Sequence, residues 1–240
     1  MTMQFSASRP ANSAPIERFL SHCHHRRYPN KAIITRPGEA NRTLFYVVSG
    51  SLTISAEDGA GREIILSYAN PGDFIGELGV FHDVQQRHVV VRTRSICDLA
   101  EVSYERLSQL LTGPLREDAP QLLYQLGKQL AERLLVTSRK VSRLAHMDVT
   151  NRVARTLIDL CQEPQAISHP DGCQIRISRQ ELSRIVGCSR EMVGRVVKQL
   201  EEQGTILVNG KTIVVLGYGS DEGPVLLTRP LVPVNNRGGK

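Results

Sequence analysis

Short runs of β-branched and aromatic residues, separated by turn signals, occupy the chain from Lys31 to about Val102. Many short strands at this spacing are typical of an antiparallel sandwich or barrel. No helical pattern of about 15 residues separates the runs, which disfavours a parallel βαβ fold. The predicted strands are Ala32–Ile34, Leu44–Val48, Ser51–Ile54, Glu63–Tyr68, Phe74-Ile75 and His88–Val91.

Helical periodicity follows, predicting short helices over Ile16–Cys23 and Tyr104–Leu111 and one long helix from Pro120 to about Met147. At 1.5 Å per residue the long helix spans roughly 40 Å. Apolar or small residues recur along it in the pattern of a coiled-coil seam. They are Leu123, Gly127, Leu130, Leu134, Thr137, Val141 and Leu144. We interpret this seam as the interface of a parallel homodimer; the alternative is a helix that packs only on its own domain.

The last third of the chain predicts a compact helical domain. Val149–Leu160 has an amphipathic pattern, and the capping box Ser178–Glu181 begins a helix that runs through Val186. Gly187 permits a sharp turn, and Ser189 then caps a second helix. Two short helices joined by such a turn form a helix-turn-helix.

A hairpin is predicted directly behind these two helices. Asn209-Gly210 is a strong hairpin signal, because both central residues of the favoured turn need positive φ. It joins the β-rich runs Ile206–Val208 and Lys211–Val215, and another turn is predicted at His169–Gly172. A helix-turn-helix followed by a hairpin is typical of a winged helix.

Composition places the chain among soluble globular proteins. It has 240 residues, of which 40% are hydrophobic and 22% charged, and no window approaches the ~18 apolar residues that cross a bilayer. The first residues lack the features of a secretion signal, so we expect a cytoplasmic protein. The net charge of +6 falls entirely after residue 120: residues 1–120 carry 13 basic and 13 acidic side chains. This asymmetry favours a polyanionic partner for the second half.

The cysteines and histidines do not form a recognisable metal or disulfide pattern. The five cysteines are odd in number, widely spaced and without a CxxC motif, which indicates isolated reduced thiols. His22–His25 contains three histidines, but adjacent residues rarely converge on one ion. We therefore expect no metal site.

In the second helix of the helix-turn-helix, an apolar stripe is expected to pack in the core, which leaves a charged face outside. The stripe consists of Val193, Val196, Val197 and Leu200. The N-terminal end of this helix is the part that meets base edges in the major groove. Arginine can donate two bonds to guanine, and glutamate can accept one from cytosine. We expect Arg190, Glu191 and Arg195 to read bases; the alternative is a merely solvated face. Phosphate contacts are expected from Ser178, Arg179, Gln180, Ser189 and Lys198.

Eight segments of the sequence resemble the cyclic AMP receptor protein (CRP/FNR) family of bacterial transcription regulators. They are Leu20–His24, Tyr28-Pro29, Ile65–Tyr68, Gly72–Gly79, Asp148–Thr150, His169–Gly172, Ile185–Glu191 and Gly210–Val215. The resemblance covers about residues 15–216 and implies an α+β fold. Its parts would be an antiparallel, jelly-roll-like β-roll effector domain (15–119), a dimerisation helix (120–147) and a winged helix-turn-helix (148–216), with disordered tails at 1–14 and 217–240.

The resemblance also implies partners. Arg190, Glu191 and Arg195 match residues that read a TGTGA-like half-site. One loop resembles the surface with which members of the family contact RNA polymerase. It consists of Ser168, His169, Pro170, Asp171 and Gly172. His24 and Arg26 fall near a second such surface, where one basic position has changed type. The N-terminal cysteine cluster of the oxygen-sensing iron–sulfur relatives is absent, which disfavours that branch.

The glycine-rich turn Gly72–Gly79 is the candidate effector site. Glycines let backbone N–H groups approach a phosphate, Glu77 can accept from a ribose hydroxyl, and Arg87 can pair with the phosphate. Gly76 is one of these glycines, and the resemblance places Thr137 and Ser138 against the base. The alternatives are that Gly76 and Gly79 only shape a turn and that Thr137 is only a tolerated seam residue.

His88 departs from the cyclic AMP pattern, in which a serine follows the phosphate arginine. A bulky imidazole would crowd a six-membered cyclic phosphate. Pro114–Gly127 and Ser189–Met192 instead resemble the CAP-like protein branch, whose effector is cyclic di-GMP. In that setting an arginine can bond the Hoogsteen edge of guanine and an aspartate can accept from its N1–H and N2–H. Candidates are Arg143, Arg155 and Asp159; Arg155 and Asp159 are four apart on a helix and could instead form a surface ion pair.

We therefore predict a homodimeric, DNA-binding transcription regulator with no catalytic cofactor, with cyclic di-GMP favoured as effector over cyclic AMP. Two alternatives stay open: a cyclic AMP-dependent regulator and an effector-independent DNA-binding factor with a vestigial pocket. An enzyme that uses the β-roll pocket is disfavoured, because no Ser-His-Asp, paired-acid or metal constellation gathers there.

Overall fold

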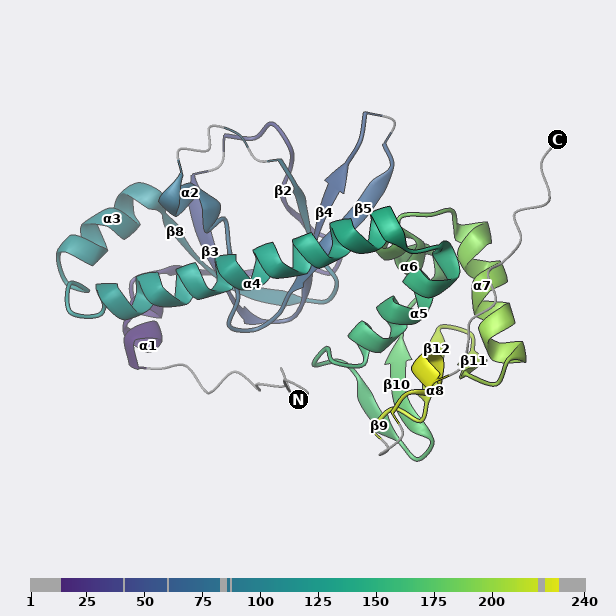
Figure 1. Cartoon of the computed structure of the whole chain (residues 1–240). Helices are drawn as coiled ribbons and strands as arrows, with labels where there is room; N and C mark the ends of the chain where they lie inside the picture. The colour runs from purple at the N-terminus through teal and green to yellow at the C-terminus, as the bar shows by residue number, and fades with distance from the viewer. Residues whose placement is uncertain are drawn as a thin grey trace. The chain divides into compact units, whose positions relative to one another are not determined.

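The computed structural model describes residues 14–40, 42–59, 61–82, 86, 88–219 and 223–228 (Figure 1). They form two compact units, which divide between Ser138 and Arg139 inside the long helix α4 (Ala119–His146). Among the described residues every pair of neighbouring strands is antiparallel, and helices occur beside the sheets, so the predicted α+β class is confirmed. None of the helices in the described ranges is long and apolar enough to span a membrane.

Two four-stranded sheets form the centre of the N-terminal unit. One has the order β1-β8-β3-β6, and the other β2-β7-β4-β5. Phe45 and Val47 from the first sheet share a hydrophobic core with Leu52 and Ile54 from the second, so the sheets pack face to face. The strands are β1 (His24–Tyr28), β2 (Ile33–Thr35), β3 (Thr43–Ser49), β4 (Leu52–Glu57), β5 (Glu63–Ala69), β6 (Phe74–Ile75), β7 (Val90–Thr93) and β8 (Cys97–Ser103).

Strand β3 of the first sheet is buried on both faces. Leu44 and Tyr46, which alternate with the inter-sheet residues along β3, belong to a second core that includes helix residues. This double burial explains why β3 reads as a continuous apolar run instead of an alternating one. The helices on this side are α1 (Ala14–Leu20), α3 (Tyr104–Thr112) and the first part of α4; α2 (Leu78–Phe81) is a single turn.

Helix α4 buries one stripe and exposes another. Leu122, Leu126 and Gln129 are buried in the N-terminal unit. Residues of the predicted seam stay accessible instead: the exposed fraction is 67% for Leu134 and 60% for Val141. The seam is therefore a separate face from the one that α4 uses within its own unit.

The described part of the C-terminal unit combines helices α5, α6, α7 and the short α8 with a four-stranded sheet of order β11-β12-β10-β9. Its core draws on α5, α6, α7 and the sheet, as predicted for a winged helix-turn-helix. The elements are α5 (Val149–Leu160), β9 (Ile167–His169), β10 (Gly172–Arg176), α6 (Arg179–Val186), α7 (Arg190–Glu202), β11 (Ile206–Asn209), β12 (Thr212–Leu216) and α8 (Val225–Thr228).

Several elements differ from the sequence predictions. Strand β1 was not predicted, because its residues are mostly exposed and only pairing with β8 defines it. His88 lies before β7 instead of within it. In the wing, Asn209 pairs with Thr212, so the turn is Gly210-Lys211 with positive φ at Gly210 (61°) but not at Lys211. This is the pattern of a type II′ turn instead of the expected Asn-Gly type I′ turn.

The predicted disordered tail from Gly217 is corrected in part. Residues 217–219 and 223–228 are described, and Leu226 in α8 is buried in the core of the C-terminal unit. An apolar side chain that finds a place in this core orders the segment around it. At the other end, Ala14 begins α1, whereas residues 1–13 and 229–240 lie outside the described residues.

Candidate nucleic-acid interface and effector residues

The turn between α6 and α7 is fixed by local hydrogen bonds. Gly187 adopts a left-handed conformation (φ 71°) that ends α6, and its N–H donates to the Ser183 carbonyl at 2.9 Å. Ser189 then caps α7, because its hydroxyl accepts from the N–H of Met192 at 3.2 Å. The sequence predicted both features, and together they set the direction in which α7 leaves the turn.

Helix α7 separates an apolar face from a charged face as its sequence predicts. The stripe of Val193, Val196, Val197 and Leu200 is buried against the rest of the unit. Arg190, Glu191, Arg195 and Lys198 are all exposed. Lys198 lies 3.6 Å from a carboxylate oxygen of Glu202 one turn later, whereas the three predicted base-reading residues lie toward the N-terminal part of the helix.

Helix α6 presents its first turn beside this surface. The Ser178 hydroxyl accepts from the Glu181 N–H at 3.1 Å, and Arg179 and Gln180 are exposed.

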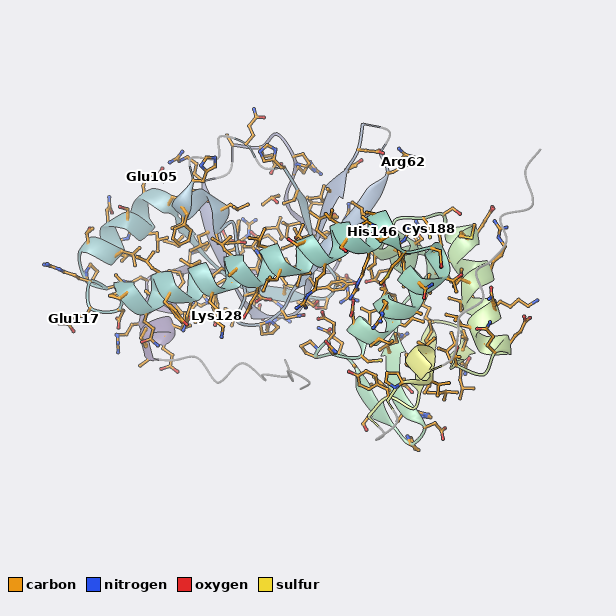
Figure 2. All side chains as sticks on the ribbon, in the orientation of Figure 1. Arg62, Glu105, Glu117, Lys128, His146 and Cys188 are labelled. Carbon is orange, nitrogen blue, oxygen red and sulfur yellow. The ribbon has the colours of Figure 1, made fainter. Side chains whose placement is uncertain are left out.

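Cys188, labelled in Figure 2, lies in the turn before α7. Burial raises the pKa of its thiol, and the nearby Arg152 only partly opposes this shift. The thiol is therefore protonated near neutral pH, and its nucleophilicity is low.

The glycine-rich turn of the N-terminal unit is held by close contacts. Gly76 has a positive φ of 93°, and its carbonyl accepts a hydrogen bond from the Tyr104 hydroxyl at 2.7 Å. A Cβ at Gly79 would collide with the ring of Tyr104. Both glycines thus have structural reasons to be present, whether or not a phosphate approaches the turn.

Glu77 already has a partner inside its own unit. Its side chain is buried and forms an ion pair with Arg133 of α4, which we call the N-terminal pair. The Phe74 carbonyl accepts from Arg133 at 2.9 Å and from the Gln129 amide at 2.8 Å, and the Phe74 N–H donates to Gln129 at 2.7 Å. The carboxylate predicted to bind a ribose hydroxyl is therefore engaged by α4.

Sequence reasoning missed Arg133 and Gln129. A signal for them exists: Leu122, Leu126, Gln129 and Arg133 continue one stripe at helical spacing beside the predicted seam. Two polar residues at the end of an otherwise buried stripe require hydrogen-bond partners. Their partners, Phe74 and Glu77, are distant in the sequence, so the pattern indicates the need but not the contact.

The other predicted effector residues of this unit are not gathered around Glu77 by any described bond. His88 is exposed, and Thr137 and Ser138 are exposed on α4. Arg87 lies outside the described residues. Among the residues of this region that the structure describes, no hydrogen bond or ion pair brings these predicted ligands together.

In the C-terminal unit, two of the three predicted guanine ligands meet. Arg143 near the end of α4 donates to Asp159 of α5 through both terminal nitrogens, the second bond being 3.3 Å long; we call this the C-terminal pair. The alternative of an Arg155–Asp159 ion pair is corrected: the Asp159 carboxylate bonds Arg143, and Arg155 is exposed on α5. Asp159 therefore pairs with an arginine of the neighbouring helix α4, not with the arginine one turn away on its own helix.

The predicted polymerase-contact segment forms the β9–β10 hairpin. Ser168 pairs with Cys173 in the ladder, and the Asp171 N–H donates to the His169 ring at 3.2 Å. Pro170 and Asp171 are exposed, and Gly172 packs so closely on Val215 that no side chain fits there. The hairpin is thus a defined projection of the sheet edge.

The histidine-rich segment does not form a metal site among the described residues. His24 and Arg26 are exposed on the edge strand β1, and the His25 ring lies 3.1 Å from the Leu20 carbonyl. Within the described ranges no group of three or more histidine, cysteine, aspartate or glutamate residues is placed to hold an ion.

Comparison with known proteins identifies both units. A cyclic nucleotide-binding domain family matches residues 25–113, and a Crp-like helix-turn-helix domain family matches residues 151–218. The CRP-like protein Clp of Xanthomonas euvesicatoria pv. vesicatoria (strain 85-10) is 54% identical over 206 residues, which cover 86% of this chain and 90% of the relative.

Solved structures agree with this match. The structure of CLP from Xanthomonas campestris, described as a c-di-GMP-responsive global regulator, is 54% identical, with a TM-score of 0.82 over 86% of this chain and 100% of that one. A CRP/FNR-family transcriptional regulator from Thermus thermophilus is 25% identical, with a TM-score of 0.67 over 80% and 93% of the two chains. With its nucleotide-binding domain and its helix-turn-helix both matched, the chain belongs to the CRP/FNR family of transcription regulators.

Proposed function

We propose that the protein is a homodimeric regulator that reads a TGTGA-like palindrome and responds to cyclic di-GMP. The observation that carries the DNA-reading part is the geometry of α7. Arg190, Glu191 and Arg195 are exposed toward its capped N-terminal end, while the opposite face is fully buried. This arrangement suits insertion of the helix into a major groove. Ser178, Arg179, Gln180, Ser189 and Lys198 would contact phosphates.

The seam on α4 supports a dimer. Leu134 and Val141 are large apolar side chains that remain mostly exposed, and the buried face of the helix is a different one. A second copy of α4 would cover them by coiled-coil packing. Two recognition helices would then meet successive major grooves about 34 Å apart, as a palindrome requires. The β9–β10 hairpin, Ser168–Gly172, would contact RNA polymerase.

Two observations favour cyclic di-GMP over cyclic AMP. A relative that is 54% identical is described as c-di-GMP-responsive. In addition, Glu77 is bonded to Arg133, so the carboxylate that would hold the ribose of cyclic AMP is engaged. Arg143, Arg155 and Asp159 offer guanidinium donors and a carboxylate acceptor for guanine, in a different unit. Cyclic AMP, or no effector, remains the competing assignment.

The test is a DNA titration followed by fluorescence anisotropy, without nucleotide and with saturating cyclic di-GMP or cyclic AMP. We expect cyclic di-GMP alone to change the affinity for a TGTGA-containing duplex, by at least about fivefold. An unchanged affinity with both nucleotides would sink the effector assignment and favour an effector-independent factor.

Base reading is tested by Arg190→Ala, with Lys198→Ala as the matched control on the same helix. Loss of a bidentate arginine–guanine contact costs about 1–3 kcal/mol at one base pair, so Arg190→Ala should no longer discriminate substitutions there. Lys198→Ala should weaken all duplexes alike. If Arg190→Ala also weakens all duplexes equally, the residue contacts backbone and the recognition-helix assignment is wrong.

A further inference from the structure

A segment that follows the matched helix-turn-helix domain folds back onto that domain. The family match ends at residue 218, whereas the structure describes residues 217–219 and 223–228, which include the short helix α8. Helix α8 contacts strand β12 of the same unit (Figure 1). Its role therefore has to be inferred from its own contacts.

Leu226 anchors α8 in the core of the C-terminal unit. Its side chain is only 2% exposed, and it belongs to the same buried cluster as Leu157 of α5 and Val215 of β12. Removing a leucine side chain from water is favourable, and it restrains the backbone that carries the side chain. This anchor holds α8 in place although the helix has only four residues.

The residue before the anchor packs on Gly217, which directly follows β12. A Cβ at Gly217 would lie 3.1 Å from the Val225 Cγ2 atom and 3.0 Å from the Gly223 carbonyl oxygen, so a side chain there would push against the segment that carries α8. Gly217 also has a positive φ of 69°, which favours glycine. A movement of α8 therefore changes the packing around the backbone of Gly217.

Gly217 in turn holds the base of the β9–β10 hairpin. Its N–H donates to the Asp171 carbonyl at 2.9 Å. Gly172 pairs with Leu216 of β12, and a Cβ at Gly172 would lie 3.2 Å from the Gly217 nitrogen. The backbone of Gly217 is thus a point at which the hairpin is tied to the rest of its unit.

The hairpin has few other restraints of this kind. Strand β9 has three residues and lies at the edge of the described sheet, where it pairs only with β10. A short edge hairpin of this sort is weakly held by its own hydrogen bonds. Any loop that must adopt one conformation to bind a partner loses affinity when it is not held in that conformation beforehand.

We propose that α8 is an intramolecular brace that positions the β9–β10 hairpin for its contact with RNA polymerase. Leu226 anchors the brace, and Val225 transmits the restraint to the hairpin through Gly217. All three are positioning residues, since they act on the polymerase contact only through the hairpin. This inference rests on the proposed contact of the hairpin with RNA polymerase, and it gives a role to a segment that lies beyond the family domain.

The test compares two truncated chains, one that ends at Tyr218 and lacks α8, and one that ends at Thr228 and keeps it. Each is bound to a TGTGA-containing duplex, with whichever nucleotide condition gives the tighter DNA complex, and RNA polymerase is titrated onto that complex. We expect the chain that ends at Tyr218 to bind polymerase at least about fivefold more weakly than the full chain does. The chain that ends at Thr228 should equal the full chain.

DNA affinity is the internal control of this experiment. The direction of α7 is set by local hydrogen bonds of Gly187 and Ser189, which both truncated chains keep. Both should therefore bind the duplex as tightly as the full chain does. A brace predicts a loss of polymerase affinity alone, whereas a general structural role of α8 would change both affinities together.

Point variants test the brace in a chain of full length. Leu226→Asp places a carboxylate in the core and should weaken polymerase binding as the loss of α8 does, whereas Leu226→Met conserves volume and should keep the wild-type affinity. Gly217→Ala should also weaken polymerase binding, because its methyl group meets Val225 and Gly223. The same substitution should have a smaller effect in the chain that ends at Tyr218, where both of these residues are missing.

The outcomes separate the brace from the proposed polymerase contact. The double variant His169→Ala with Asp171→Ala removes two hairpin side chains but keeps the carbonyl that accepts from Gly217. If it binds polymerase as wild type does, the hairpin is not the contact surface and the brace fails with it. If it is weakened but the chain that ends at Tyr218 is not, the polymerase contact stands and the brace is wrong. Loss of DNA binding in the chain that ends at Tyr218 also overturns the brace, since α8 would then support the whole unit.

Discussion

Helix α4 carries two arginine–carboxylate pairs, one in each unit, that share their chemistry but differ in their surroundings. In the N-terminal pair the side chains of Arg133 and Glu77 are 21% and 5% exposed. In the C-terminal pair those of Arg143 and Asp159 are 29% and 49% exposed. The main difference is the burial of the carboxylate, which decides how readily each pair can exchange its partner.

The hydrogen bonds around the two pairs strengthen this contrast. Arg133 shares the Phe74 carbonyl with Gln129, and Gln129 also accepts from the Phe74 N–H. A buried polar group that loses such a partner cannot turn to water instead. Asp159 can do so. The N-terminal pair should therefore hold α4 to its unit more firmly than the C-terminal pair holds α4 to α5.

The largest expected effect is the loss of stability in Arg133→Met. Removing one partner of a buried pair leaves an uncompensated charge and costs about 3 kcal/mol. Urea unfolding followed by circular dichroism measures it, with Lys128→Met as the control on an exposed part of the same helix. If the free energy of unfolding falls by less than about 1 kcal/mol, the N-terminal pair contributes no more than an exposed ion pair. The two pairs would then not differ in strength.

Gln129→Leu should have the next largest effect. It keeps a side chain of similar size but leaves the Phe74 N–H and carbonyl without their amide partner, at a cost of about 1–3 kcal/mol. Gln129→Glu sharpens the measurement, since a carboxylate can accept from the N–H but cannot donate to the carbonyl. We expect it to be destabilised as well; a stability equal to wild type would mean that the bond to the carbonyl contributes little.

The sequence predicted the parts of the molecule that local rules determine. Ser178, Ser189 and Gly187 specify the helix-turn-helix through caps and a left-handed residue, and the stripe on α7 follows from its own periodicity. The exposure of Arg190, Glu191 and Arg195 could therefore be predicted before any tertiary contact was known. The seam on α4 is likewise a property of one helix.

Contacts between distant segments could not be predicted in the same way. Glu77 was expected to face a ribose, yet Arg133 reaches it from a helix far along the chain. Asp159 has an arginine one turn away at position 155, but the fold brings Arg143 closer. Spacing shows which residues on one helix can meet; only the packing of elements shows which of several arginines does. Strand β1 was missed for the same reason.

Breaking the C-terminal pair should barely change stability. Arg143→Met and Asp159→Asn are each expected to alter the free energy of unfolding by about 1 kcal/mol or less, because water replaces the lost partner. The same urea experiment as for Arg133→Met gives the value. Should either variant lose about 3 kcal/mol, the pair would be structural, and any change in DNA affinity could be a consequence of unfolding.

The smallest expected effect is the response of the two pairs to salt. Double-mutant cycles in urea, an uncharged denaturant, give the coupling energy of each pair, with Glu77→Gln and Asp159→Asn as the carboxylate variants. The coupling of Arg143 with Asp159 should be about 0.5 kcal/mol at about 0.01 M salt and near zero at about 1 M, where the Debye length is about 3 Å. That of Arg133 with Glu77 should change little, since ions do not reach a buried carboxylate. A C-terminal coupling that persists at the higher salt concentration would mean that Asp159 is held more tightly than its exposure implies, and a guanine base could then not displace Arg143 at low concentration.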